Sequence, residues 1–188
     1  MPKIAFLIHG WQSEPYSGWR PWLKAELEKL GWKVIVPAMP NPDYPKQEEW
    51  VGHIRHLVNM LGGPGGNFYF VGHSLGCPTV LRYIESLGDG QKVGGAVLVA
   101  GVVEYNEIAE LENFFLEPFD WTKIKSGCRK FVAINSDNDP YIPLEHGQIL
   151  KEELDAELVV LPKQGHFSSS EGFTELPAAL EALLRIAE

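Results

Sequence analysis

The 188-residue chain has few cysteines, a shortage of basic residues and no long apolar run. Its only two cysteines, Cys77 and Cys128, cannot build the disulfide framework that is typical of small secreted proteins. No apolar run approaches the ~18 residues that suggest a membrane-spanning helix, and the run at 4–8 is too short for the core of a signal peptide. We therefore expect a cytoplasmic protein with reduced thiols and no membrane segment.

The shortage of basic residues bears on the expected partners. Sixteen lysines and arginines stand against 25 aspartates and glutamates, which gives a formal net charge of −9 at pH 7. Nucleic acids and anionic membranes recruit proteins through basic surfaces, so this balance argues against both as partners. It places no restriction on a small neutral substrate.

Short apolar segments alternate with amphipathic ones along the whole chain. The expected strands are 4–8, 33–36, 68–71, 93–99, 130–135 and 158–161. The expected helices are 19–30, 47–61, 75–87, 144–154 and 174–187, with a partly helical connection at 102–126. Because the strands are apolar on both sides and alternate with helices, the pattern predicts one α/β domain over 1–188, with three αβα layers and about six mostly parallel strands.

The most informative motif is Gly72-His73-Ser74-Leu75-Gly76, which lies between an expected strand and an expected helix. A strand, a G-x-S-x-G turn and a helix together describe a nucleophile elbow, a strained turn that lifts the serine hydroxyl out of the end of the sheet. Glycines flank such a turn because strand and helix pass too closely for side chains. The motif predicts Ser74 as a nucleophile.

Two later strand ends carry the groups that a serine nucleophile needs. The fifth expected strand runs into Ser136-Asp137-Asn138-Asp139-Pro140, and the sixth runs into Gln164-Gly165-His166-Phe167. A histidine removes the serine proton, and a carboxylate holds that histidine in the correct tautomer. The order serine, aspartate, histidine, each at the end of its own strand, is the chain order of α/β-hydrolases.

Six histidines compete for the role of the base: His9, His53, His56, His73, His146 and His166. His166 alone follows the last strand in a short loop, which is where a general base belongs in this arrangement. His53 and His56 are three residues apart on an expected helix and offer no third metal ligand, so a solvated helix face is the better interpretation. We expect no metal and no cofactor.

The remaining histidines receive structural interpretations. His9 and His73 stand beside the glycines of their motifs and are expected to make structural hydrogen bonds. As a second possibility, His9, Gly10, Trp11 and His73 are candidate substrate contacts. His146 is expected on the surface of a helix.

Five stretches give the chain a specific resemblance to a family. They are Ile8-His9-Gly10-Trp11, Pro40-Asn41-Pro42, Gly72-His73-Ser74-Leu75-Gly76, Ser136-Asp137-Asn138-Asp139-Pro140-Tyr141-Ile142-Pro143 and Gly165-His166-Phe167. With them the chain resembles the α/β-hydrolase superfamily, and within it the small retinoblastoma-binding-protein-nine-like (YdeN-like) serine hydrolases. The resemblance implies a minimal α/β-hydrolase fold with little or no cap, without the first two strands of larger relatives.

The resemblance also assigns roles to residues. It implies Ser74, Asp139 and His166 as a catalytic triad, with Asp139 preferred over Asp137 because the acid precedes the Ile142-Pro143 step by three residues. Pro140 supports this choice, since it biases Asp139 toward an extended conformation.

An oxyanion hole is expected from two backbone N–H groups. Leu75 supplies one because it follows the nucleophile, and the resemblance points to Trp11 for the other. The L-x-C-x-E motif that binds pocket proteins is missing from the family match, since Thr79 follows Leu75-Gly76-Cys77-Pro78. That partner is therefore not expected.

Taken together, these features predict a serine hydrolase that acts on a small ester, thioester or amide through an acyl-enzyme, with esters favoured. Two alternatives stay open: an acyltransferase with the same triad, and a catalytically weak protein-binding module on a hydrolase scaffold. The aromatic-rich segment 102–121 either covers the site as a small flap or packs mainly on the sheet. The substrate and the oligomeric state are left undetermined.

Overall fold

The computed structural model describes residues 2–105 and 107–188 and contains a six-stranded sheet. The strands are β1 (Ile4–Ile8), β2 (Lys33–Ile35), β3 (Phe68–His73), β4 (Gly95–Val99), β5 (Phe131–Ser136) and β6 (Glu157–Leu161). Their order across the sheet is β2-β1-β3-β4-β5-β6, and every pairing is parallel. All six carboxyl ends therefore meet at one edge, where ligands bind in sheets of this kind.

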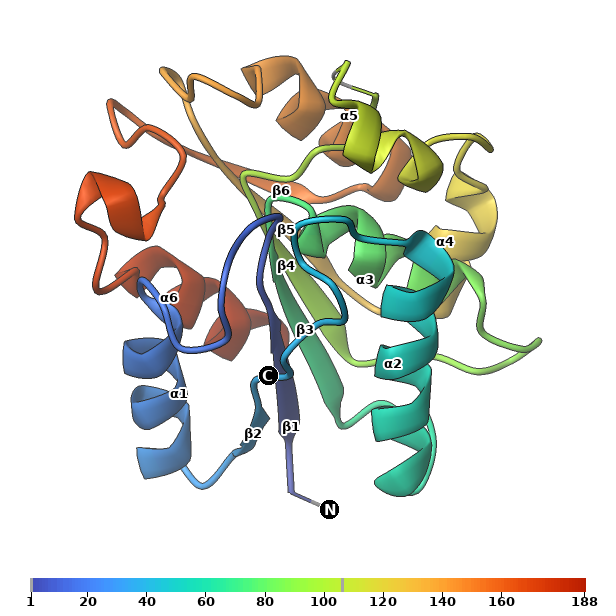
Figure 1. The fold of residues 1–188 in the computed structure, drawn as a ribbon. Coiled ribbons are helices and arrows are strands. Elements are labelled where there is room, and N and C mark those ends of the chain that lie inside the picture. Colours follow the sequence, from blue (N-terminus) through green and yellow to red (C-terminus); the bar gives the residue numbers. More distant parts are fainter. Residues whose placement is uncertain (1, 106) are drawn as a thin grey trace.

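Helices cover both faces of the sheet (Figure 1). They are α1 (Arg20–Lys29), α2 (Gln47–Met60), α3 (Gly76–Glu85), α4 (Trp121–Gly127), α5 (Leu144–Leu154) and α6 (Pro177–Ile186), with short 3-10 turns η1 (Ala109–Phe114) and η2 (Ser169–Glu171). Helices α1 and α6 pack on one face, and α2, α3, α4 and α5 pack on the other. Among the described residues, no helix combines the length and the apolar character needed to cross a bilayer.

Strand β3 shows why the apolar segments become central strands. Its alternate side chains point to opposite faces, so Phe68 and Phe70 enter the core under α2 and α3, while Tyr69 and Val71 enter the core under α1 and α6. None of these four side chains is more than 6% exposed. A strand that is apolar at every position needs a helical layer on both sides, which confirms the predicted three-layer architecture.

The observed elements differ from the predicted ones mainly at their ends. Strand β4 begins at Gly95 because Val93 makes only an isolated bridge to Cys128. Helix α6 begins at Pro177, a residue that suits the first turn of a helix because it has no N–H to leave unpaired. The connection expected to be partly helical at 102–126 contains η1 and α4.

Candidate active site

Ser74 occupies a sharp turn between β3 and α3. Its φ of +53° lies in the left-handed region, which a non-glycine residue adopts only when its surroundings enforce it. The turn is anchored to the neighbouring strand β4, because the N–H of Ser74 donates to the carbonyl of Val99 at 2.9 Å. This geometry is that of the predicted nucleophile elbow.

The two glycines of the motif are required by close backbone contacts. A Cβ on Gly72 would lie 2.7 Å from the carbonyl carbon of Gly76, and a Cβ on Gly76 would collide with the carbonyl oxygen of Ile8. Gly10 also lets the end of β1 approach closely, since a Cβ there would lie 3.0 Å from the Cβ of Ser74. The ends of β1 and β3 therefore meet directly at the serine.

His166 and Asp139 meet at the ends of β6 and β5. Asp139 Oδ2 lies 2.8 Å from His166 Nδ1, and the Asp139 side chain is only 1% exposed. The other carboxylate oxygen of Asp139 accepts the N–H groups of Tyr141 and Ile142 at 2.9 and 3.0 Å. These bonds fix the carboxylate, so that Nδ1 of His166 carries a proton and Nε2 is left free to accept one.

The alternative acid, Asp137, lies elsewhere. Its Oδ1 accepts the backbone N–H of Lys163 at 2.7 Å and so joins the loops after β5 and β6. Ser136 reinforces this junction, because its hydroxyl accepts the N–H of Gln164 at 2.9 Å. The structure thus brings Asp139, and not Asp137, to the imidazole.

A residue that sequence reasoning missed supports the histidine loop from behind. Both carboxylate oxygens of Glu171 accept the backbone N–H of His166, each at 3.0 Å, and Oε2 also accepts from the N–H and hydroxyl of Ser168. Partial burial works against the charge of Glu171, but these hydrogen bonds outweigh it and lower its pKa below the usual 4.5. The spacing Ser168-x-x-Glu171 is that of a capping box and is the signal that could have found it.

His73 lies directly beneath the histidine loop. Its Nε2 donates to the backbone carbonyl of His166 at 2.8 Å, and the two rings are 5.0 Å apart. Burial, assisted by the nearby His166 and Arg20, lowers the pKa of His73 well below its usual value. A neutral ring with its proton on Nε2 follows, which fits the expected structural role.

His9 has a similar structural role on the other side of the serine. Its Nδ1 donates to the carbonyl of Gly10 at 2.8 Å, and its Nε2 accepts the N–H of Met39 at 3.2 Å. Burial lowers the pKa of His9 to about 4. Of the four candidate substrate contacts, Gly10, Trp11 and His73 line the cavity at Ser74, whereas His9 lies outside that wall.

The three remaining histidines are His146, His53 and His56. His146 was expected on the surface, but it is buried, with 7% of its surface exposed, and its Nδ1 accepts the N–H of Val103 at 3.0 Å. It therefore holds the segment after β4 in place. His53 and His56 lie on α2, and the described residues contain no cluster of three potential metal ligands.

Two backbone N–H groups near Ser74 have no partner among the described residues. They belong to Leu75, which precedes the first residue of α3, and to Trp11, which follows β1. The indole of Trp11 is anchored separately, since its Nε1 donates to the carbonyl of Asp43 at 3.0 Å. Free donors at these two positions are what the expected oxyanion hole needs.

A cavity of about 420 Å³ opens over Ser74 and His166. Its apolar wall contains Val102, Ile108 and Leu111, and its polar wall contains Arg20 and the serines at 13, 17 and 168–170. The aromatic residues of the segment 102–121 are not among the lining residues, and Phe114 is completely buried in the core. The segment thus contributes aliphatic side chains to the cavity, with position 106 outside the described residues.

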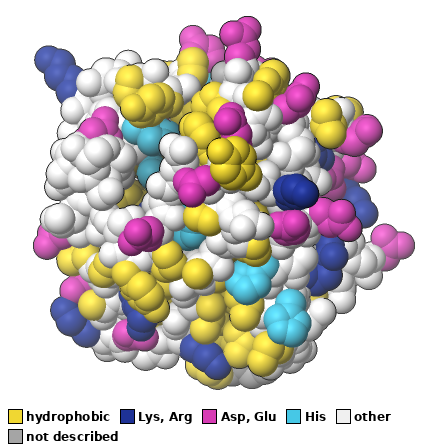
Figure 2. Space-filling model, viewed as in Figure 1, with side chains coloured by type: hydrophobic (Ala, Val, Ile, Leu, Met, Phe, Trp, Pro, Cys, Tyr) yellow, Lys and Arg dark blue, Asp and Glu magenta, His cyan; other side chains and the backbone are white. Residues whose placement is uncertain are grey.

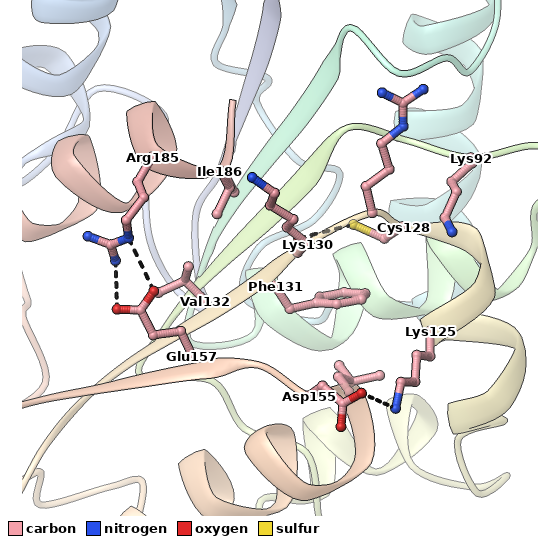
Figure 3. Close-up of a pocket in the computed structure, with 12 residues that line it drawn as sticks. Lys92, Lys125, Cys128, Lys130, Phe131, Val132, Asp155, Glu157, Arg185 and Ile186 are labelled. Atoms are coloured by element: carbon pink, nitrogen blue, oxygen red, sulfur yellow. Dashed lines mark hydrogen bonds and ion pairs between the residues drawn. The ribbon is translucent and has the colours of Figure 1, made fainter. Parts of the chain in front are cut away.

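A larger cavity of about 570 Å³ lies at the opposite edge of the sheet, near the start of β5 (Figure 3). Both acidic side chains of its wall form ion pairs, since Arg185 contacts Glu157 at 2.9 Å and Lys125 contacts Asp155 at 2.5 Å, whereas the remaining cations Lys92, Arg129 and Lys130 form none among the described residues. The thiol of Cys128 is the nucleophilic group in its wall, but burial raises the pKa of that thiol to about 12. A thiol of this kind stays protonated, so Cys128 offers no counterpart to the serine and histidine that lie together at the carboxyl edge.

The parallel sheet, the nucleophile elbow and the serine–aspartate–histidine order define an α/β-hydrolase fold. Comparison with known proteins agrees with this class: the family model described as "Serine hydrolase" matches residues 5–185. The chain belongs to this family of serine hydrolases.

Individual relatives cover nearly the whole chain. The YdeN protein of Bacillus subtilis strain 168 is 34% identical over 184 residues, which span 97% of this chain and 95% of the relative. The crystal structure of the B. subtilis ydeN gene product matches with a TM-score of 0.92 at 33% identity, covering 98% of both chains. The serine hydrolase RBBP9 of Rattus norvegicus is 26% identical over 170 residues, covering 89% of this chain and 87% of the relative.

Proposed function

We propose that this serine hydrolase cleaves a small carboxylic ester through an acyl-enzyme, with Ser74 as nucleophile, His166 as base and Asp139 as the group that orients His166. The observation that carries the proposal is the 2.8 Å hydrogen bond between Asp139 and His166 at the rim of the cavity into which Ser74 projects. Thioesters and amides are chemically related substrates. Esters are favoured because their C–O bond breaks more easily than the C–N bond of an amide, whose nitrogen must be protonated before it can leave.

The acylation step uses the free nitrogen of His166. As Ser74 Oγ attacks the carbonyl carbon, its proton passes to His166 Nε2, and Asp139 stabilises the resulting imidazolium through Nδ1–H. The tetrahedral intermediate then collapses, the bond to the leaving alcohol breaks, and Nε2 returns the proton to that alcohol. In the described residues the Ser74 hydroxyl makes no hydrogen bond, and such a bond often tightens only when substrate binds.

Deacylation repeats these steps with water as the nucleophile. His166 Nε2 takes one water proton while the hydroxide forms a bond to the acyl carbon, and it then returns the proton to Ser74 Oγ as the ester bond to the serine breaks. The products are a carboxylic acid and the free enzyme. An acyltransferase would differ only in admitting an alcohol or amine in place of water.

The N–H groups of Trp11 and Leu75 would stabilise the negative charge that develops on the carbonyl oxygen. Each such preorganised donor is typically worth roughly 2.7–4 kcal/mol of transition-state stabilisation. Leu75 also stands at the start of α3, where the helix dipole favours negative charge.

A fluorophosphonate probe tests the assignment. We expect it to label the wild-type protein and to fail on Ser74→Ala, with Ser126→Ala as the control because Ser126 lies exposed on α4 and does not line the cavity. Labelling of Ser74→Ala at the wild-type rate would refute the assignment. A folded wild-type protein that takes up no probe would favour the protein-binding alternative, and product analysis with an added alcohol distinguishes hydrolysis from acyl transfer.

A further inference from the structure

Arg20 is an unusual member of the cavity wall. It is the first residue of α1, it is only 3% exposed, and it lines the same cavity as Ser74. Arginine is rarely buried to this degree without a carboxylate partner, because removing an unpaired charge from water is costly. The surroundings of Arg20 therefore matter, because they determine whether its charge is paired within the protein.

All hydrogen-bond acceptors around Arg20 are neutral. Nε donates to the carbonyl of Pro15 at 3.2 Å, and Nη2 donates to the carbonyl of Glu14 at 2.7 Å and to the hydroxyls of Ser13 and Ser17 at 2.9 and 2.7 Å. No ion pair within the described residues includes Arg20. Its third nitrogen, Nη1, donates to no described residue and is not sealed from solvent.

The two serines next to Arg20 add to its capacity to bind an anion. Their hydroxyl oxygens lie 3.3 Å apart, and each already accepts a hydrogen bond from Nη2. The Ser17 hydroxyl donates to the carbonyl of Glu14 at 3.1 Å, so the proton of the Ser13 hydroxyl is the one that can turn either to Ser17 or into the cavity. The wall thus presents the Nη1 N–H of Arg20 as a free donor, and the Ser13 hydroxyl can turn to donate beside it.

Negative charge is missing from the cavity wall. The chain has 25 acidic residues, and none of the described lining residues is an aspartate or a glutamate; the nearby carboxylates of Asp139 and Glu171 lie behind the lining residues His166 and Ser168 and are hydrogen-bonded to them. Acidic side chains are instead spread over the outer surface, as the face in Figure 2 shows. The positive charge of Arg20 also acts on two buried histidines, His73 and His9. Burial is the main cause of their lowered pKa values, and the charge of Arg20 lowers both further.

We propose that Arg20 makes the cavity selective for substrates that carry a carboxylate, which pairs with the guanidinium while the ester carbonyl lies at Ser74. This inference rests on the proposed function and names its substrate class. A carboxylate suits the site because arginine binds it through directed, charge-assisted hydrogen bonds. Val102, Ile108 and Leu111 would contact the apolar part of the same substrate.

The wild-type enzyme alone gives the first test. Mono-4-nitrophenyl adipate and 4-nitrophenyl methyl adipate have the same acyl chain and leaving group, and only the first has a free carboxylate. We expect kcat/KM for the charged ester to exceed that for the methyl-capped ester by roughly tenfold to a hundredfold, which is the size of a hydrogen bond to a charged group. 4-Acetoxybenzoate and its methyl ester form a matched pair with the carboxylate on the alcohol side. Absence of a preference in both pairs would overturn the proposal.

Variants then assign the preference to Arg20. In Arg20→Gln the ratio of the two kcat/KM values should fall to near one, and in Arg20→Lys it should be intermediate because the charge remains without the planar fork. Lys24→Gln is the matched control, since Lys24 lies one turn further along α1, pairs with Glu28 and does not line the cavity; its ratio should equal that of the wild type.

The outcomes separate the two proposals. Equal losses for charged and neutral esters in Arg20→Gln would mean that Arg20 only orders the loop at 13–17, and would overturn the inference. If Arg20→Gln does not fold, the proposal is still tested by the ratio of the two kcat/KM values in the wild-type enzyme and in Arg20→Lys. If the proposed function itself is wrong, the fluorophosphonate probe will fail to label Ser74 in the wild-type protein, which is a separate measurement from the substrate pairs.

Discussion

The carboxylate of Glu171 holds the backbone N–H of His166 through both of its oxygens, each at 3.0 Å. Glu171 touches no reacting atom, so we regard it as a positioning residue for the proposed base. Glutamine at this position has no charge and keeps one of the two acceptor oxygens. Alanine has neither the charge nor an acceptor oxygen. We expect kcat to fall about tenfold in Glu171→Gln and further in Glu171→Ala, with KM little changed, because the imidazole would lose its preferred position.

The low pKa of Glu171 predicts how this effect depends on pH. A carboxylate whose pKa is lower in the folded state stabilises that state above its unfolded pKa, near 4.5, and the stabilisation is lost as the pH falls through the folded value. Hydrogen exchange of 165–172, expressed relative to the intrinsic exchange rate at each pH, should therefore rise below pH 4.5 in the wild type. In Glu171→Gln it should already be high at pH 7, and an unchanged exchange rate in that variant would contradict the role.

The two candidate acids should respond very differently to the same substitution. Asp139→Asn keeps the shape of the side chain but reverses the hydrogen bond that sets the tautomer of His166, so kcat should fall by about 10³–10⁴. Asp137→Asn only weakens a hydrogen bond to the N–H of Lys163, and a change within about threefold is expected. Steady-state kinetics on one chromogenic ester compares them, and a larger loss in Asp137→Asn would reverse the assignment.

Buried neutral histidines should make the folded state sensitive to mild acid. The pKa of His9 is about 4 when folded and 6.5 when unfolded, so between these values the unfolded chain binds a proton that the folded one does not. Stability is then fully present above pH 6.5 and falls as the pH approaches 4, by up to about 3 kcal/mol from His9.

Urea denaturation at several pH values between 7 and 4 measures this effect. His9→Gln cannot titrate, so its stability should change less with pH, although it starts lower because a buried hydrogen bond is altered. His73 contributes in the same direction, and part of the pH dependence will therefore remain. An identical slope in the variant would show that His9 is not responsible.

The glycine at position 76 should be indispensable to the fold. A Cβ there would collide with the carbonyl oxygen of Ile8, a backbone atom that cannot move without displacing β1. We expect Gly76→Ala to destabilise the protein by about 3 kcal/mol or more. Gly52 within α2 is the control, because a Cβ there meets nothing within 4 Å, and Gly52→Ala should add roughly 0.5–1 kcal/mol of stability. Thermal unfolding of both variants gives the comparison.

Local patterns were sufficient to predict the fold and the neighbourhood of Ser74. Alternating apolar strands and helices specify a covered parallel sheet, and the short sequence around the serine contains its own turn, glycines and helix start. These features depend on residues that are close in sequence, so they can be recognised there.

Features that depend on distant partners were not visible in the sequence. The burial of His146 results from its contact with Val103, 43 residues earlier, and nothing in its own helix indicates it. In the sequence, Arg20 looks like an ordinary helix residue, because its burial depends on how the loop at 13–17 packs against it. Glu171 lay in a recognisable capping pattern, but its contact with His166 depends on how the loop after β6 returns to the protein.

The parallel order of the sheet has a consequence for how activity is acquired. The proposed site draws on the ends of β1, β3, β5 and β6, and β6 is both late in the chain and at the edge of the sheet. Intermediates in which β1, β3 and β4 have already assembled would show much of the helical signal and would still lack His166. Catalytic activity should therefore return in the last kinetic phase of refolding, after circular dichroism has recovered, and so it reports the docking of this edge strand.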